Sequence, residues 1–348
     1  MKIGLVCPYD LGRHGGVQDQ VVRLAGWLRG RGHETVLVGA GEDGEDSPDG
    51  SVRLGRATVL PGNRSAVPIM IDPRVGSRLQ HALAGCDVVH VHEPFMPTIG
   101  PAALRLAGVP LIATFHADAP RWARRGYSLG RHGARALLGR VAITTAVSRV
   151  AASALDPIVP VRIVPNGIDV GDYTPRRAKT PGRAVFVGRD DPRKGLDVLL
   201  RAWPEIRNTM PDATLRIIGA ERDDPPRGVA FLGRLSEADK RMELSAAEVL
   251  IAPNTGGESF GIVVLEGMAA GCVVVASALP AFTSVLGSTG VLTAVGDESG
   301  IARAVSALFA DDQGRVALQD EAQLRAGRFD GSVVTDTYLD IYEEAVAL

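Results

Sequence analysis

The chain has 348 residues, 45% of them hydrophobic and 22% charged, and its formal net charge at pH 7 is −2. This length exceeds one ordinary hydrophobic core, so two domains are expected, and the near-neutral charge gives no reason to expect nucleic acid as a ligand. The three cysteines are widely spaced in apolar contexts, which excludes a disulfide framework and favours a reducing compartment. The N-terminal apolar stretch is too short for a signal peptide and no window of about 20 apolar residues is present, so a cytosolic enzyme is expected.

Short apolar runs alternate with amphipathic stretches along the whole chain. In the first half, strands are expected at 3–7, 35–39, 88–92, 111–114, 143–147 and 161–164, and helices at 17–31, 73–84 and 101–107. In the second half, strands are expected at 184–187, 215–218, 229–232, 249–252 and 273–276. Apolar strands between helices indicate parallel sheets covered on both faces, with ligands at the carboxyl ends of the strands. The sequence therefore predicts an α/β protein of two Rossmann-like, doubly wound domains.

The boundary between these domains is expected in the turn-forming segment 164–169, Val-Pro-Asn-Gly-Ile-Asp, which is suited to a hinge. The first domain would take residues 1–164 and the second residues 165–331. The last segment, 332–348, has apolar residues at helical spacing. It is expected to form a helix that returns to complete the first domain.

The most specific motif is the segment 254–272, which carries Glu258 and Glu266 around an apolar run. Glu258 is expected in the loop at a helix N-terminus and Glu266 about two turns into that helix, both facing one cleft. The free N–H groups at 260–262 predict an anion site at the helix start. The alternative is a loop and a core helix that carry two glutamates by chance, but an unpaired carboxylate inside this apolar run would be costly. A phosphate site with one carboxylate for a sugar and one for a ribose predicts a nucleotide-sugar pocket.

Lysine is rare, because only four of the 38 Lys and Arg residues are lysines. A lysine in such a chain is interpreted as selected for its compact ammonium group. Lys194 ends the loop Arg189-Asp-Asp-Pro-Arg-Lys194, which follows the expected strand 184–187. Three cations at this place can neutralise a diphosphate. The alternative is a surface turn that begins a helix at Lys194.

The loop after the first strand contains Gly15-Gly16 directly before a helix. Glycine lets the backbone approach a phosphate and directs helix N–H groups at it. A simple tight turn is the alternative interpretation, since the dinucleotide fingerprint is absent. Tyr9 and Gln18 flank the same rim.

Histidines follow two expected strands. His116 comes just after the strand 111–114, where α/β enzymes keep ligand-facing groups, although a lone histidine is often structural. His90 and His92 share one strand face but lack a third ligand at helical spacing, so no metal site is expected.

The segment 119–149 contains seven arginines and no acid, with aromatic and leucine side chains between them. It predicts either a basic amphipathic surface that binds an anionic membrane or a solvated helix face with its aromatic residues in the core. Nearby glycines weaken a long helix here.

Taken together, these residues resemble the retaining nucleotide-sugar glycosyltransferases of the GT-B fold, and within them the bacterial phosphatidyl-myo-inositol mannosyltransferases. The resemblance covers nearly the full length. In the first half it rests on the opening Ile-Gly-Leu-Val-Cys-Pro-Tyr9, Gly15-Gly16-Val-Gln18, Val-His90-Val-His92-Glu93-Pro, Ala-Thr-Phe-His116 and Pro-Asn166-Gly167-Ile-Asp169. In the second half it rests on Val-Gly188-Arg189, Pro-Arg193-Lys194-Gly195 and the two-glutamate segment.

The resemblance implies a donor site. Its expected catalytic residues are His116, Arg189, Lys194 and Glu258. Glu258 and His116 would bind the transferred sugar, and Arg189 with Lys194 the diphosphate. Glu266 would bind the ribose hydroxyls. Backbone N–H groups of Gly16, Phe260, Gly261 and Ile262 would assist at the phosphates, and Leu235 and Lys240, with Glu237, match the region that holds the guanine base.

The acceptor is implied in the same way. Positions near an inositol acceptor are Tyr9, Gln18, Asn63, His116 and Arg121. The chain departs from the expected pattern at 66–70, where Ala-Val-Pro-Ile-Met stands in place of an arginine, and its loop after Gly188 is one residue shorter.

The implied activity is transfer of a hexose, mannose from GDP-mannose, to phosphatidyl-myo-inositol with retention of configuration. No metal or other cofactor is expected, because arginine and lysine supply the positive charge. The expected location is cytoplasmic, peripheral on the inner face of the plasma membrane. Two alternatives stay open: a transferase that uses a UDP-sugar and a soluble inositol phosphate or glycan, and a non-catalytic nucleotide-sugar-binding protein at the membrane.

Overall fold

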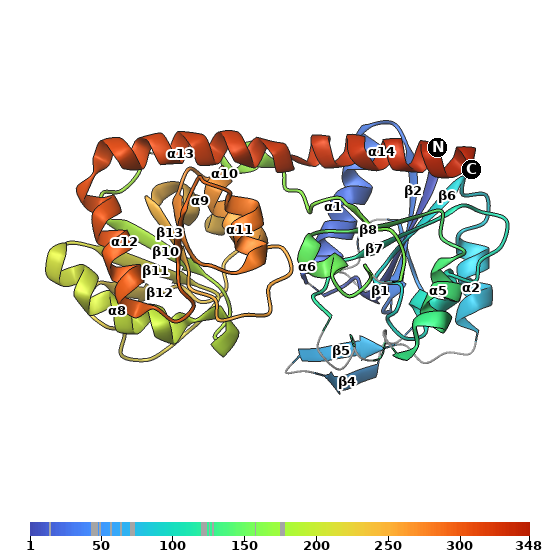
Figure 1. Cartoon of the computed structure of the whole chain (residues 1–348), viewed down its shortest axis with the longest axis horizontal. Helices are drawn as coiled ribbons and strands as arrows, with labels where there is room; N and C mark the ends of the chain where they lie inside the picture. The colour runs from blue at the N-terminus through green and yellow to red at the C-terminus, as the bar shows by residue number, and fades with distance from the viewer. Residues whose placement is uncertain are drawn as a thin grey trace. The chain divides into compact units, whose positions relative to one another are not determined.

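The computed structural model describes all residues except 14, 43–47, 49, 56–57, 63–64, 70–73, 120–123, 125, 127–128, 157 and 175–177, and describes only the backbone of 58–62 and 65–69. The chain divides into two compact units (Figure 1). Unit 1 holds Met1–Gly167 and Gly331–Leu348, and unit 2 holds Ile168–Asp330. The sequence prediction placed these divisions after residues 164 and 331. The first lies later in the structure because the N–H of Ile168 donates to the carbonyl of Phe329 at 3.1 Å, which joins residue 168 to unit 2.

The described part of unit 1 contains a seven-stranded sheet in the order β3-β2-β1-β6-β7-β8-β9. All neighbouring strands in it are parallel. The strands are β1 (Lys2–Asp10), β2 (Glu34–Ala40), β3 (Ser51–Arg53), β6 (Val88–His92), β7 (Leu111–Phe115), β8 (Ile143–Ala146) and β9 (Arg162–Ile163). Every residue of β6 and β7 is buried, as expected of strands covered on both faces. A separate antiparallel hairpin, β4 (Thr58–Gly62) with β5 (Ser65–Ile69), follows β3.

Helices from both ends of the chain cover the sheet of unit 1. They are α1 (Gly16–Gly30), α2 (Val75–Ala82), α3 (Ile99–Ala103), α5 (Arg131–Leu138), α6 (Arg149–Ala152) and α14 (Gly331–Ala347). The core joins Leu24 of α1 to Tyr342 of α14, and Figure 1 shows this C-terminal helix beside the N-terminal strands and α1. Gly331 is required at the start of α14 because a Cβ there would collide with the indole of Trp27.

Unit 2 has a six-stranded parallel sheet in the order β12-β11-β10-β13-β14-β15. Its strands are β10 (Arg183–Val187), β11 (Thr214–Ile218), β12 (Val229–Phe231), β13 (Val249–Ala252), β14 (Val273–Ser277) and β15 (Val291–Thr293). Its helices are α7 (Val170–Tyr173), α8 (Leu196–Thr209), α9 (Glu237–Ala246), α10 (Ile262–Ala269), α11 (Pro280–Leu286), α12 (Glu298–Ala310) and α13 (Asp312–Ala326), with short 3₁₀ turns at Pro192–Lys194 and Gly327–Phe329. The strand order reverses between β10 and β13, which is where a doubly wound sheet opens a crevice at its carboxyl edge.

Both sheets are parallel and carry helices in the pattern of the doubly wound α/β class, so the predicted fold class is confirmed. Among the described residues, no helix is long and apolar enough to cross a bilayer.

Candidate donor and acceptor site

The candidate donor site of unit 2 is built from two loops that leave neighbouring strands at the reversal of strand order. One loop follows β10 and contains Arg189 to Gly195, and the other follows β13 and contains Asn254 to Gly261. Gly195 has φ +72°, and a Cβ there would overlap the carbonyl oxygen of Pro253. Only glycine therefore allows the two loops to approach this closely.

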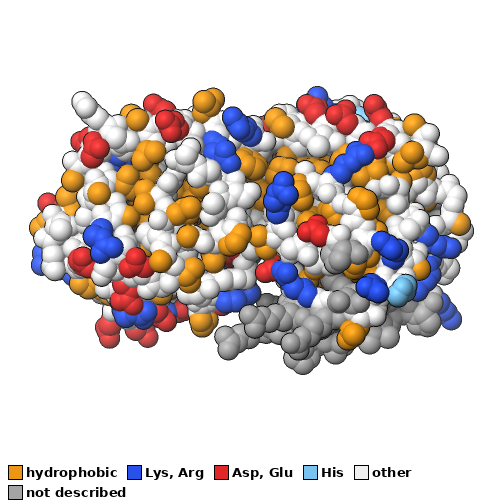
Figure 2. Space-filling view, in the orientation of Figure 1, with side chains coloured by type: hydrophobic (Ala, Val, Ile, Leu, Met, Phe, Trp, Pro, Cys, Tyr) orange, Lys and Arg blue, Asp and Glu red, His pale blue; other side chains and the backbone are white. Residues whose placement is uncertain are grey.

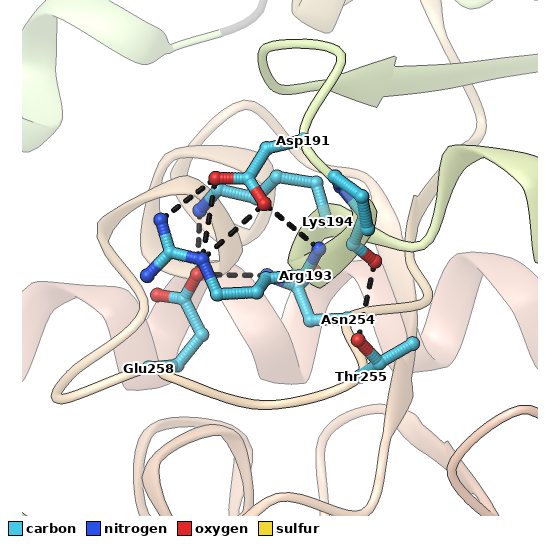
Figure 3. A network of polar contacts seen from close by, with 7 residues as sticks. Asp191, Arg193, Lys194, Asn254, Thr255 and Glu258 are labelled. Carbon is cyan, nitrogen blue, oxygen red and sulfur yellow. Dashed lines mark hydrogen bonds and ion pairs between the residues drawn. The ribbon is translucent and has the colours of Figure 1, made fainter. Parts of the chain in front are cut away.

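The first loop is shaped by Asp191. Its carboxylate accepts the N–H of Arg193 at 2.9 Å, which caps the 3₁₀ turn, and it pairs with the guanidinium of the same arginine at 2.7 Å (Figure 3). Hydrogen bonding to Arg193 lowers the pKa of Asp191 to about 2. The second loop is joined to this turn because the N–H of Thr255 donates to the carbonyl of Arg193 at 2.8 Å.

Lys194 and Glu258 meet across the two loops. The Lys194 ammonium donates to Oε1 of Glu258 at 2.5 Å, and the amide of Asn254 donates to the same oxygen at 2.7 Å (Figure 3). Oε2 of Glu258 has no hydrogen-bond partner within the described part of the chain. The carboxylate is thus held by one oxygen while the other is available to a ligand hydroxyl.

The three cations of the first loop differ in their partners. Arg193 is tied to Asp191 and Lys194 to Glu258. Arg189 is exposed, and its side chain makes no ion pair with any described residue. Of the three, Arg189 is therefore the cation without a direct ion pair, although its charge helps to lower the pKa of Asp191.

The start of α10 forms a second feature of the donor site. Gly261 caps the helix with φ +102°, and a Cβ there would lie 2.7 Å from the Phe282 ring. The cap has no side-chain hydrogen bond and the first turn carries no acid. The N–H groups from Ile262 onward thus form an uncompensated positive helix end. Phe260 is buried and packs edge-on against Phe329.

Glu266 lies inside the unit, 2% exposed, and is paired. Its Oε1 accepts from the hydroxyl of Tyr173 at 2.8 Å and from the ammonium of Lys240 at 3.0 Å. Lys240 also contacts Glu237 at 2.9 Å. Burial lowers the pKa of Lys240, but the charges of Glu266 and Glu237 outweigh it and leave that pKa raised. Two residues predicted to bind different parts of a nucleoside are therefore bound to each other, and Leu235 lies in the turn before α9, half-buried.

In unit 1, His116 follows β7 and is 7% exposed. Its Nε2 lies 2.9 Å from Nδ1 of His92. Its backbone N–H donates to Oε1 of Glu93 at 2.6 Å, and the next N–H, of Ala117, donates to the same oxygen at 2.7 Å. Burial lowers the pKa of His116 to about 4, with the Asn166 amide acting in the opposite direction. The ring is therefore neutral at pH 7.

His90 belongs to the hydrophobic core of unit 1. Its Nδ1 contacts the hydroxyl of Tyr342 at 2.8 Å and its Nε2 contacts Oγ1 of Thr114 at 2.6 Å. Burial, and then the charge of His116, lower the pKa of His90 to about 3. No cluster of three metal-binding side chains occurs within the described residues.

The remaining predicted positions lie at the start of α1 or outside the described residues. Gly16 is the first residue of α1, which has no side-chain cap, and no atom lies within 4 Å of a Cβ built on it. Gln18 reaches back to the carbonyl of Asp10 at 3.5 Å, and Tyr9 is half-buried at the end of β1. Asn63 and Arg121 lie outside the described residues, so their acceptor role stays a prediction.

Several residues that shape the site were not predicted from the sequence. Asn254 and Glu93 each come directly or almost directly after a buried strand, which is the signal that could have identified them. Asp191 carries a turn-capping signal, an acid followed by proline. Tyr173 gives no such signal, because its contact with Glu266 spans 93 positions of the chain.

Comparison with known proteins agrees with this geometry. The family model described as Glycosyltransferase Family 4 matches residues 14–172, and the one described as Glycosyl transferases group 1 matches residues 181–311. The phosphatidyl-myo-inositol mannosyltransferase of Mycolicibacterium smegmatis is 36% identical over 368 residues, covering 99% of this chain and 94% of that protein. The enzyme of the same name from Propionibacterium freudenreichii is 35% identical over 376 residues, covering 99% and 95%.

Solved structures share the fold at lower identity. HepE from Anabaena, in complex with UDP and glucose, superposes with a TM-score of 0.75 at 19% identity and covers 99% of both chains. A glycosyltransferase from Rickettsia africae gives a TM-score of 0.77 at 17% identity, covering 99% of this chain and 98% of that one. The chain therefore belongs to the family 4 glycosyltransferases of the GT-B fold, the family that contains the bacterial phosphatidyl-myo-inositol mannosyltransferases, as its motifs predicted.

Proposed function

We propose that this protein transfers a mannosyl residue from GDP-mannose to the inositol ring of phosphatidyl-myo-inositol, with retention of the anomeric configuration. The observation that carries this proposal is the 36% identity, over 99% of the chain, to a protein named phosphatidyl-myo-inositol mannosyltransferase. The paired loops of unit 2 support the donor half of the proposal, because they bring cations and a carboxylate to the carboxyl edge of a doubly wound sheet.

The diphosphate of the donor is assigned to Arg189, Lys194 and the open helix start at Gly261. As the glycosidic bond lengthens, negative charge develops on the leaving phosphate, and Arg189 with Lys194 stabilises it. Glu258 is assigned to a hydroxyl of the transferred sugar through its open Oε2. No metal or other cofactor is needed in this scheme, since the cations are supplied by the protein.

Attack is proposed to occur from the face that the diphosphate leaves, with the phosphate taking the acceptor's proton. A double displacement would need a carboxylate behind the anomeric carbon, and in this proposal Glu258 binds a sugar hydroxyl instead, through the oxygen that Lys194 and Asn254 leave open. His116 is assigned to the sugar as a neutral hydrogen-bonding group, because burial lowers its pKa to about 4. Glu266 and Lys240 are assigned to the nucleoside. Donor binding would then either break the ion pair between them or add the nucleoside as a further partner of that pair.

A lipid acceptor requires access to a membrane surface. The face of α5 carries exposed Arg131 and Arg135, with Arg140 just after the helix and Leu129, 88% exposed, just before it. Figure 2 shows several Lys and Arg side chains on this part of unit 1. We assign this basic surface to anionic lipid headgroups, where each cation contributes about 1 kcal/mol, and we place the enzyme peripherally on the cytoplasmic leaflet.

The direct test incubates purified protein with radiolabelled GDP-mannose or UDP-glucose over vesicles that contain phosphatidylinositol, over phosphatidylcholine vesicles, or with soluble inositol phosphate. We expect label in the organic phase only from GDP-mannose with phosphatidylinositol. Label transferred from UDP-glucose, or to soluble inositol phosphate, would overturn the assignment of donor or acceptor. Donor binding without transfer to any acceptor would identify a non-catalytic binder.

The membrane surface is tested separately by vesicle flotation. The double variant Arg131→Ser/Arg135→Ser should float less with phosphatidylserine vesicles than the wild type. The matched control is Arg201→Ser, which removes an exposed arginine from unit 2, where it pairs with Glu298. Equal flotation of all three proteins would reject this surface.

A further inference from the structure

Glu93 occupies a strained backbone conformation at the end of β6. Its φ is +48°, a region that side chains other than glycine rarely adopt, and it precedes Pro94, which restricts it further. Strain of this kind persists only when surrounding contacts hold the residue in place, and it occurs mostly at functional sites. The contacts of Glu93 therefore indicate what the strain achieves.

Three of those contacts lead to β7 and the loop after it, which carries His116, while the carbonyl of Glu93 accepts the N–H of Met96 at 2.9 Å. The N–H of Glu93 donates to the carbonyl of Thr114 at 2.8 Å. Its carboxylate, 8% exposed as a residue, accepts the N–H groups of His116 and Ala117 through one oxygen at 2.6 and 2.7 Å. The carboxylate thus binds the backbone of the loop on which the His116 ring is mounted.

The ring itself is held by His92. Nδ1 of His92 lies 2.9 Å from Nε2 of His116, and the ring of His92 lies over that of His90 with 4.0 Å between centroids. His90 is fixed in turn, since both its nitrogens are bonded to core hydroxyls. Only Nε2 of His92 and Nδ1 of His116 have no hydrogen-bond partner among these rings, counting the described residues and their side chains.

We propose that Glu93 and His92 are positioning residues for His116, which fix its loop and its ring so that Nδ1 is the nitrogen presented to the sugar of the donor. This inference rests on the proposed function, which places His116 at that sugar. Glu93 fixes the backbone and His92 occupies Nε2, so Nδ1 is the ring nitrogen left for a ligand, with the Asn166 side chain near enough to raise the pKa of the ring. Both rings are neutral, so each carries one N–H. Either Nδ1 of His92 or Nε2 of His116 therefore donates the hydrogen bond between them.

Substitutions at His92 test the ring contact. An asparagine amide reaches the place of the histidine Nδ1, whereas a glutamine amide reaches the place of Nε2. His92→Asn is therefore expected to keep more transfer activity than His92→Gln or His92→Ala, which should lose about tenfold or more in kcat/KM because the ring is misplaced. Equal losses in all three variants would overturn the role of His92.

A direct readout is the ¹⁵N spectrum of the imidazoles. In the wild type, we expect Nε2 of His116 to report a hydrogen bond to His92, and His92→Gln should change the His116 signals while those of exposed His81 stay in place. A loss of fold would instead move all histidine signals. A His116 Nε2 that reports no hydrogen bond in the wild type would contradict the proposal.

Substitutions at Glu93 test the backbone contact. Glu93→Gln keeps an oxygen that can accept the two N–H groups. Glu93→Gly removes the carboxylate but relieves the positive φ, so it should fold. We expect Glu93→Gly to have a lower kcat/KM than Glu93→Gln by about tenfold, measured at a temperature at which circular dichroism shows both variants to be folded. Equal activity of the two variants would overturn the role of Glu93.

The His116→Ala variant separates this inference from the proposed function. If His116→Ala transfers mannose as fast as the wild type, the assignment of His116 to the sugar is wrong. If His116→Ala is impaired while His92→Ala and Glu93→Gly are not, the assignment stands and only the positioning role fails.

Discussion

Lys194 and Glu258 are 64 positions apart in the chain, and the ammonium of the first donates to Oε1 of the second at 2.5 Å. Their side chains are 27% and 17% exposed, so water screens the pair only in part. The cation assigned to the donor's diphosphate already has an internal counterion. A diphosphate must therefore compete with Glu258 for Lys194 or share it.

This competition predicts opposite effects of Glu258→Gln on binding and on transfer. Without the carboxylate charge, GDP should bind about three- to tenfold more tightly, because Lys194 is no longer neutralised. Mannosyl transfer should fall by about tenfold or more, because the sugar loses its carboxylate partner. Titration calorimetry with GDP and a radiolabel transfer assay measure the two effects.

The control removes an equal charge elsewhere in unit 2. Glu298→Gln breaks an exposed pair with Arg201, whose side chain is 56% exposed, and should leave both GDP affinity and transfer unchanged. GDP binding that weakens in Glu258→Gln would show that the carboxylate organises Lys194 instead of competing for it.

Arg189 and Arg193 form a natural pair for a second prediction. Arg189→Ala should weaken GDP binding by about tenfold with little change in melting temperature, since the exposed guanidinium makes no ion pair with a described residue and can bind phosphate. Arg193→Ala should mainly lower the melting temperature, because it removes the guanidinium partner of Asp191 and leaves only the backbone N–H to hold that carboxylate. The measurements are the GDP affinity and the melting temperature of both variants. If Arg189→Ala binds GDP as tightly as the wild type, Arg189 does not belong to the diphosphate site.

Much of the fold could be predicted because the strands are apolar throughout. The observed bounds of β6 and β13 are the predicted ones, and most other strands differ only at their ends. The short strands β3 and β15 were not predicted, since Ser-Val-Arg and Val-Leu-Thr are not apolar throughout, whereas the equally short β12, Val-Ala-Phe, is. The hairpin β4–β5 was also missed, because Pro61 and Pro68 weaken a strand signal.

Site residues could be predicted from the sequence where they directly follow a strand. They could not be predicted where their position depends on contacts between distant parts of the chain. Arg189, Lys194 and Glu258 lie on loops after β10 and β13, as their positions in the sequence indicate. The pairing of Glu266 with Lys240 and Tyr173 was not predicted, because it joins three elements whose packing no local pattern specifies. The sequence analysis expected Glu258 and Glu266 to face one cleft. It did not include the buried contacts of Glu266 with Tyr173 and Lys240.

The contact between His90 and α14 predicts unequal effects for two tyrosines. Tyr342→Phe leaves Nδ1 of His90 buried without a partner and should lower the free energy of unfolding by about 1–3 kcal/mol. Tyr338→Phe removes a longer contact of 3.3 Å to Thr114, which keeps its bonds to His90 and Thr145, so the loss should be smaller. Urea unfolding compares the variants, and equal losses would contradict this account of how the C-terminal helix is held.

The buried histidines of unit 1 predict acid sensitivity. Burial lowers the pKa of His90 to about 3 and that of His116 to about 4, from a value of 6.5. Between these values the unfolded chain binds more protons than the folded one, so the free energy of unfolding falls as pH falls below 6.5. Each such histidine adds a slope of up to about 1.4 kcal/mol per pH unit.

Carboxylates also contribute to acid unfolding, so the histidine share is isolated with His90→Gln. Glutamine can still bond to Thr114 but does not titrate, and the variant should show a shallower decline of unfolding free energy between pH 6.5 and 4, whatever its stability at pH 7. His81→Gln, on the exposed part of α2, is the matched control and should keep the wild-type slope. If His90→Gln and His81→Gln give the same slope as the wild type, His90 is protonated in the folded state, and the hydrogen bonds to Tyr342 and Thr114 must be reassigned to a charged ring.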